Sequence, residues 1–117
     1  MDSKELRKRT KQFALRIIRL TASLPAGRVG DVLGRQILKS GTSVGANYRE
    51  ALRASSKRHF ISTAEIALRE ADETLYWLEL LAESGTVKPT RLRALADEAD
   101  QLVAILAATV RTAKKRS

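Results

Sequence analysis

The stretch from Ser40 to Leu81 constrains the fold of this chain more than any other part of the sequence. Its first part, Ser40 to Arg53, is rich in small residues. Its second part repeats small or apolar residues at helical spacing, namely Phe60, Ala64, Ala67, Ala71, Thr74 and Leu78. At 3.6 residues per turn these six lie on one stripe, and small side chains on a stripe let two helix backbones approach closely. We therefore predict a tightly packed helical hairpin with its turn near Ser55 and Ser56.

Helix signals on both sides of this hairpin predict two further helices. Pro25 and Gly27 end a first helix, and Pro89 suits the first turn of a last one. We expect helices over residues 3–23, 29–54, 57–83 and 89–112, followed by a frayed basic tail over residues 113–117. Short connections predict a single all-α domain over residues 1–117, an antiparallel up-down-up-down four-helix bundle.

Glycine is unusually frequent in the second predicted helix, at Gly30, Gly34, Gly41 and Gly45. Each costs roughly 1 kcal/mol relative to alanine. The helix must therefore pack closely against a neighbour, kink near Ser40 and Gly41, or break. Residues 41–45 also match the G-x-S-x-G nucleophile elbow, which needs a strand before it. The preceding residues have a helical pattern, so we interpret the motif as small residues in a packed helix.

Two segments, SGTSVGANYREA and IALREADETLYWLELL, resemble a known family. From about Phe13 to Leu81 the chain is similar to the four-helix-bundle proteins encoded by intervening sequences in bacterial 23S rRNA genes. The accessory variability proteins of diversity-generating retroelements belong to the same group. The resemblance implies a continuous second helix and a ring-shaped homo-oligomer, with a pentamer expected. It also implies structured RNA or a reverse-transcriptase complex as partners.

Asn47, Tyr48, Arg49 and Glu50 match the characteristic run of that family. We interpret them as a polar network that pins the second helix to the first and third, with Glu70 or Glu73 in reach of Arg49. Such networks must be fully satisfied when buried, and they fix helix register. The alternative is that these residues form a functional site.

Charge is distributed unevenly over the chain, whose net charge is +9. Residues 1–54 are mostly basic, residues 55–84 are mostly acidic, and the C-terminal end is basic again. Such an excess favours a polyanionic partner. Two interpretations stay open, namely complementary charge between packed helices or subunits, and a separate basic surface for nucleic acid.

The candidate nucleic-acid contacts are a basic ridge of Arg9, Arg16 and Arg19 on the first helix, together with Lys57 and Arg58 at the start of the third. A solvated helix face is the alternative for the ridge. Because the sequence has no RNA-recognition aromatic motif, we expect phosphate contacts with little base reading.

Several apolar residues lie off the predicted core stripes and suggest oligomerisation. Leu15 and Ile18 point almost opposite to the core face of the first helix, and Trp77, with Tyr76, lies off the main stripe near Ile66. Tryptophan favours the centres of interfaces. We therefore predict a homo-oligomer.

The residues that catalysis or metal binding would need are scarce. The chain has no cysteine and a single histidine, His59, which cannot supply the paired Glu-x-x-His ligands of a ferritin-like site. No phosphate-binding glycine loop is present. We expect no catalytic residue, metal or cofactor. We also expect no signal peptide or membrane span, which fits a cytoplasmic protein.

The sequence thus predicts a non-enzymatic, basic, homo-oligomeric helical bundle that binds nucleic acid. The alternative is a protein–protein interaction scaffold, for example an accessory subunit of a reverse-transcriptase or ribonucleoprotein complex.

Overall fold

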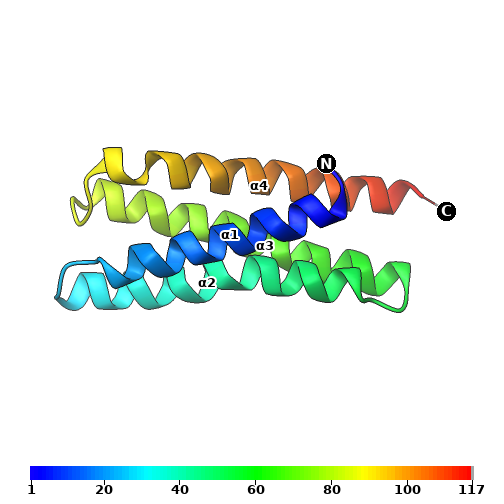
Figure 1. The fold of residues 1–117 in the computed structure, drawn as a ribbon, viewed down its shortest axis with the longest axis horizontal. Helices are drawn as coiled ribbons and strands as arrows, with labels where there is room; N and C mark the ends of the chain where they lie inside the picture. The colour runs from blue at the N-terminus through cyan, green and yellow to red at the C-terminus, as the bar shows by residue number, and fades with distance from the viewer. Residues whose placement is uncertain (117) are drawn as a thin grey trace.

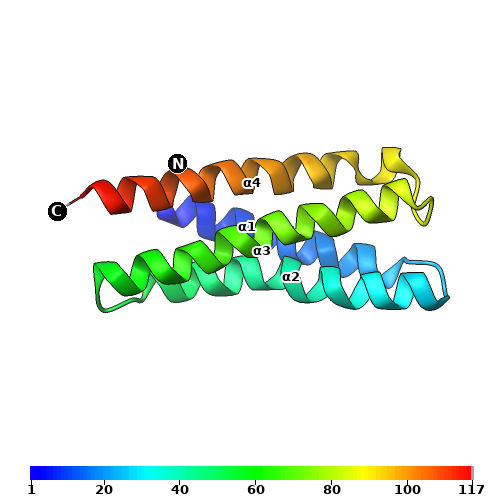
Figure 2. The same ribbon diagram turned by 180° about the vertical axis from the view of Figure 1, so that it is seen from behind.

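The computed structural model describes residues 1–116. They form four α-helices: α1 (Ser3–Ala22), α2 (Arg28–Leu52), α3 (Lys57–Glu83) and α4 (Pro89–Lys115). Successive helices run in opposite directions along a rod of 50 × 21 × 19 Å (Figures 1 and 2). The predicted all-α four-helix fold is confirmed.

Local capping signals set where the helices begin. The Asp2 carboxylate accepts a hydrogen bond from the Glu5 N–H at 2.8 Å and caps α1. The Ser56 hydroxyl accepts one from the His59 N–H at 3.1 Å and caps α3. A side-chain oxygen at this position satisfies an N–H that has no partner within the helix.

Helix α4 is longer than the sequence predicted, since it continues to Lys115 rather than ending near residue 112. Val110 is buried on it, and Lys114 Nζ lies 3.1 Å from Glu65 Oε2 of α3. Cations in the last turn also interact favourably with the helix dipole. The expected frayed tail over residues 113–117 is therefore helical as far as Lys115, and Ser117 lies outside the described residues.

The glycines of α2 serve close packing, because the helix is continuous from Arg28 to Leu52. A Cβ atom at Gly45 would lie 3.2 Å from Thr10 Oγ1 and 3.3 Å from the Thr10 backbone carbonyl, in α1. Only a residue without a side chain allows the two backbones to come this close. The helix is not broken at Ser40 and Gly41, where the sequence left an irregularity possible.

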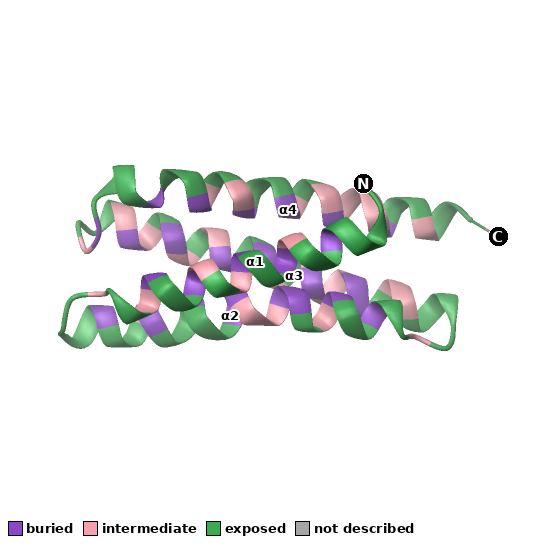
Figure 3. Cartoon of the chain, viewed as in Figure 1, coloured by how far each residue is buried: buried purple, intermediate pink, exposed green. Residues whose placement is uncertain are grey.

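The small-residue stripe of α3 is buried along the inside of the bundle (Figure 3). Its members Ala64, Ala67, Ala71 and Leu78 have almost no exposed surface, while Phe60 is half-buried. Thr74, on the same stripe, donates a hydrogen bond to Ser40 Oγ of α2 at 2.9 Å. The hairpin predicted from this stretch thus contains a buried polar contact between α2 and α3.

Candidate nucleic-acid interface

Four cations of α1 share one side of the helix. Lys4, Arg7, Lys8 and Lys11 are spaced three or four residues apart, and all are exposed. Residues at this spacing are neighbours on a helix surface. Ile17 and Thr10 pack against α2 at Gly41 and Gly45, so the adjacent side of α1 borders α2. The four cations therefore lie along the seam between the two helices.

This seam contains a cavity of about 540 Å³, which we call the α1–α2 groove. Its lining consists of cations and small residues: Lys4, Arg7, Lys8, Lys11, Ala14, Thr42, Gly45, Ala46 and Arg49. Because the residues contributed by α2 are short except for Arg49, the groove floor stays open between the two helices. Within the described chain, no carboxylate lines the groove.

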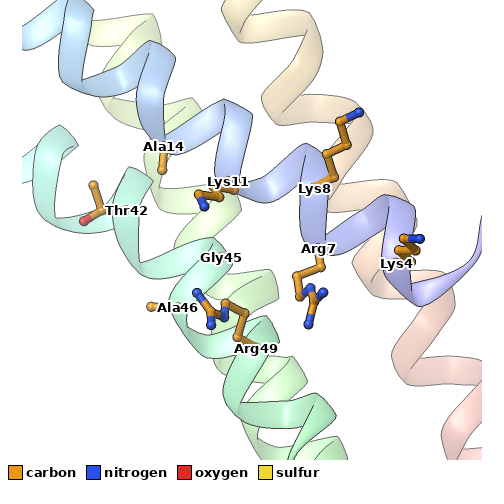
Figure 4. Close-up of a pocket in the computed structure, with 9 residues that line it drawn as sticks. All are labelled: Lys4, Arg7, Lys8, Lys11, Ala14, Thr42, Gly45, Ala46 and Arg49. Carbon is orange, nitrogen blue, oxygen red and sulfur yellow. The ribbon is translucent and has the colours of Figure 1, made fainter.

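Three of these cations come from both sides of the groove. In Figure 4 Arg7 and Lys11 extend from the side of α1 that borders α2, and Arg49 extends from α2 toward Ala46, so the three charged ends lie apart from one another along the same groove. Across residues 1–116 the ion pairs are Arg9 with Glu98 and Lys114 with Glu65, and neither includes a groove cation. The groove thus concentrates positive charge that no side chain of the described chain neutralises.

A second cavity of about 430 Å³ adjoins the groove and shares Ala46 and Arg49 with it. The rest of its lining is Glu50, Arg53 and His59. The basic surface therefore continues toward the turn between α2 and α3. Lys57 and Arg58, both predicted contacts, are exposed at that turn.

Arg9 of the predicted basic ridge is paired with α4, and its contact with nucleic acid stays a prediction. Its Nε donates to Glu98 Oε2 at 3.0 Å and its Nη2 donates to Gln101 Oε1 at 3.0 Å, both on α4. The hydrogen bond to Glu98 raises the pKa of Arg9, so this guanidinium is committed to joining α1 to α4. Arg16 is half-buried and Arg19 is exposed, and their contact with nucleic acid stays a prediction.

The described hydrogen bonds and ion pairs of residues 1–116 do not include the predicted polar network between helices. Asn47 Nδ2 donates to the Ser43 carbonyl at 2.8 Å within α2 itself. Tyr48 is buried, which raises the pKa of its phenol, while Arg49 and Glu50 are exposed. Within residues 1–116 neither of the two charged residues has an ion pair. Arg49 lines the groove beside α1 and the second cavity beside His59 of α3, and neither described lining contains a carboxylate of α3.

The Gly41–Gly45 motif lies entirely inside α2, and Ser43 Oγ donates to the Lys39 carbonyl at 2.7 Å. A nucleophile elbow needs a strand-to-helix turn, so this motif does not have that geometry. Among the residues described, no group of three His, Asp or Glu side chains is placed to hold a metal ion. Nor does the part of the chain from residue 1 to 116 contain a helix with the length and hydrophobicity to cross a membrane.

Apolar side chains remain on the surface next to these charged regions. Leu15, Ile18 and Leu38 are exposed on α1 and α2, and Tyr76 is 54% exposed on α3. Tyr76 packs edge-on against Trp77, whose Nε1 donates to Glu73 at 3.3 Å. The expected exposure of Leu15 and Ile18 is confirmed, and their use in an interface stays a prediction.

Sequence reasoning did not single out the α1–α2 groove. It counted Lys4, Arg7, Lys8 and Lys11 only as part of the basic first half of the chain, residues 1–54, and it assigned Arg49 to a structural network. The spacing of the four α1 cations was a usable signal. Nothing in the sequence placed Arg49 opposite them, because that depends on how α1 and α2 are aligned.

Comparison with known proteins identifies relatives but no established activity. A family model described as 23S rRNA-intervening sequence protein matches residues 3–108. The fold is similar to a crystal structure, at 1.70 Å resolution, of a protein with unknown function from the S23 ribosomal protein family of Bacteroides thetaiotaomicron VPI-5482. The two chains are 35% identical, the match covers 95% of this chain and 99% of the other, and the TM-score is 0.86. No curated protein matches the chain.

Proposed function

The chain belongs to the 23S rRNA-intervening sequence protein family, and from this we propose that it is a non-enzymatic, homo-oligomeric protein that binds nucleic acid through phosphate contacts. The observation that carries the proposal is the α1–α2 groove. Five cations line it without an acidic neighbour in the described lining. A polyanion is the partner that such a surface attracts most strongly.

Unpaired cations are common on protein surfaces, since an exposed ion pair contributes only about 0–1 kcal/mol. What favours binding here is their arrangement. Elsewhere on the bundle, Arg9 and Lys114 have carboxylate partners on the neighbouring helix, whereas Arg7, Lys11 and Arg49 line one groove that has no carboxylate in its described lining. Mutual repulsion among these three is relieved when a phosphate enters the groove.

Recognition by this groove depends little on base identity. Its described lining contains no aromatic side chain on which a base could stack, and no Asn or Gln that could read a base edge. Lys and Arg contacts to phosphate release counterions, so the affinity falls steeply with salt concentration.

Self-association is supported by two features of the surface. Exposed apolar residues on α1 and α2 are available for burial, and the exposed carboxylates Asp72, Glu73, Glu79 and Glu83 lie on α3. A basic face and an acidic face on the same chain suit a heterologous contact, which closes into a ring when the rotation permits. We expect five subunits, which would repeat the groove around the ring.

A second candidate function is a scaffold for another protein, such as a reverse transcriptase. It is favoured by Tyr76, which stands exposed beside Trp77 among the carboxylates of α3. An aromatic pair in an acidic surround suits a basic protein partner.

The experiment that tests the main proposal is fluorescence anisotropy of a labelled structured RNA and a labelled duplex DNA over a salt series. We expect both to bind at low salt, with similar affinities and a steep loss as salt increases. If neither binds at low salt, the nucleic-acid proposal fails and the scaffold remains.

A further inference from the structure

We propose that the α1–α2 groove is a one-ended site for the phosphorylated end of a nucleic-acid strand, in which Arg7, Lys11 and Arg49 hold a terminal phosphomonoester. This inference rests on the proposed function, because it names the part of a nucleic acid that the groove binds. The terminal phosphate can be on the 5′ or the 3′ end, and the chemistry of the site is the same for both.

The first argument is the density of charge. Arg7 and Lys11 of α1 and Arg49 of α2 line one cavity of about 540 Å³, and no carboxylate of the described chain lines it (Figure 4). A surface that follows an internal backbone distributes its cations along the strand, roughly one for each phosphate. Three cations on one cavity instead match a ligand that carries several charges over a short length.

The second argument is the charge of the ligand. A terminal phosphate monoester carries about −1.5 to −2 at pH 7, whereas an internal phosphodiester carries a single negative charge. A terminal phosphate with its neighbouring diester therefore balances the three cations. The guanidinium groups of Arg7 and Arg49 also suit a phosphate with three free oxygens, since each can donate two parallel hydrogen bonds.

The third argument is that the basic lining stops at one end. Beyond Lys11 the next positions on this side of α1 are Ala14, Leu15 and Ile18, and Leu38 follows Thr42 on α2. Leu15, Ile18 and Leu38 are exposed apolar residues. In the opposite direction the adjoining cavity carries Arg49, Arg53 and His59, together with one carboxylate, Glu50. A strand can therefore approach past Arg53 and His59 and end at Arg7, Lys11 and Arg49.

The dimensions agree with a short contact. At a rise of 1.5 Å per residue, Lys4 and Lys11 are separated by roughly 10 Å along α1. This length accommodates a terminal phosphate and the first one or two diesters. The open floor at Gly45 and Ala46 lets the sugar–phosphate chain lie close to the α2 backbone.

The test is a competition experiment with the full-length protein. A labelled RNA is displaced by three unlabelled short RNAs of the same sequence, one with a 5′-phosphate, one with a 3′-phosphate and one with hydroxyl groups at both ends. We expect one phosphorylated RNA to compete about tenfold better than the hydroxyl form, because it gains charge-assisted hydrogen bonds. The better of the two phosphorylated RNAs identifies the end that binds.

Two matched variants locate the site. The double variant Arg7→Gln and Arg49→Gln should lose the preference for the phosphorylated end. Arg35→Gln should keep it, because Arg35 is an exposed arginine on α2 outside the groove lining. Circular dichroism melting checks that all variants remain folded, which is expected since the three residues are exposed.

Each other outcome is decisive. If the wild type binds RNA without end preference, or if the double variant keeps the preference, the end-binding inference is overturned while nucleic-acid binding stands. Loss of the preference in Arg35→Gln would also overturn it, because the site would then lie beyond the groove. If no RNA binds to the wild type, the proposed function itself fails.

Discussion

Gly41 of α2 lies so close to Ile17 of α1 that a Cβ atom at residue 41 would stand 2.7 Å from Ile17 Cγ1 and 2.9 Å from Ile17 Cγ2. Ile17 is fully buried, so it cannot swing aside without disturbing the core. Together with the approach of Gly45 to Thr10, this contact lets α1 and α2 pack closely beside the groove that Arg7, Lys11 and Arg49 line.

We predict that Gly41→Ala destabilises the bundle although alanine is the better helix former. Overpacking a core costs about 1–3 kcal/mol, and the gain in helix propensity offsets about 1 kcal/mol of that. Thermal unfolding should therefore show a net loss of roughly 1 kcal/mol. Ile17→Ala removes the two closest atoms. In that background Gly41→Ala should leave the free energy of unfolding unchanged or increase it. A higher melting temperature for Gly41→Ala alone would contradict the steric argument.

The buried hydroxyl pair Thr74–Ser40 should matter more to stability than the charged residues of the Asn47–Glu50 run. Thr74→Val removes this hydrogen bond between α2 and α3 and should cost about 1 kcal/mol. Thr109→Val is the matched control, because within residues 1–116 the Thr109 hydroxyl bonds to the Ile105 carbonyl of its own helix and to no other helix. Glu50→Ala should change stability by less than about 0.5 kcal/mol, since Glu50 is exposed. Chemical denaturation measures the free energy of unfolding of the three variants. If Glu50→Ala were the most destabilising of them, this interpretation would be wrong.

Glu70 makes the stability depend on pH. Burial, with a further contribution from Glu73, raises the pKa of Glu70 above its ordinary value of 4.5. The folded state therefore binds this proton more tightly than the unfolded state does, so the contribution of Glu70 to stability decreases as pH rises through this range. Glu70→Gln should accordingly melt higher than the wild type at pH 7, and the difference should shrink toward acidic pH. A difference that grows as the pH falls would contradict the raised pKa.

The contributions of the groove and of the ridge residues Arg16 and Arg19 to binding can be compared by variants that lose the same number of positive charges. Arg7→Gln with Arg49→Gln and Arg16→Gln with Arg19→Gln each remove two positive charges. We expect the groove pair to weaken duplex DNA binding more and to flatten the slope of log K against log salt by about 0.9 for each lost phosphate contact. Anisotropy titrations measure both quantities. Equal effects from the two pairs would mean that binding follows net charge rather than the groove.

Self-association should depend on the exposed apolar residues of α1. Ile18 is 45% exposed, and Leu15 lies on the same side of the helix. We expect light scattering to report several subunits, five being the best estimate, and Leu15→Glu with Ile18→Glu to lower the mass because buried carboxylates are costly. Arg19→Glu is a control on the same helix. A monomeric wild type would contradict the oligomer, and an unchanged mass for the double variant would place the interface elsewhere.

Much of this molecule follows from patterns that repeat within a single helix. The stripe from Phe60 to Leu78, the glycines of α2 and the prolines near the loops predict four helices and which sides of them are buried. Periodicity is a local property, so it identifies a buried face without a partner being known.

Other features depend on which helix lies against each flank and on how the helices are aligned. Arg9 and Arg7 are both cations of α1, yet Arg9 borders α4 and pairs with Glu98, whereas Arg7 borders α2 and lines the groove together with Arg49. The end of α4 likewise depends on Lys114 reaching Glu65. An ion pair or a cationic groove forms between side chains that are distant in the sequence, and their separation depends on how closely the helices pack, for example where Gly41 meets the Ile17 side chain. Only the packed bundle could therefore decide which of these cations are neutralised and which remain available to a ligand.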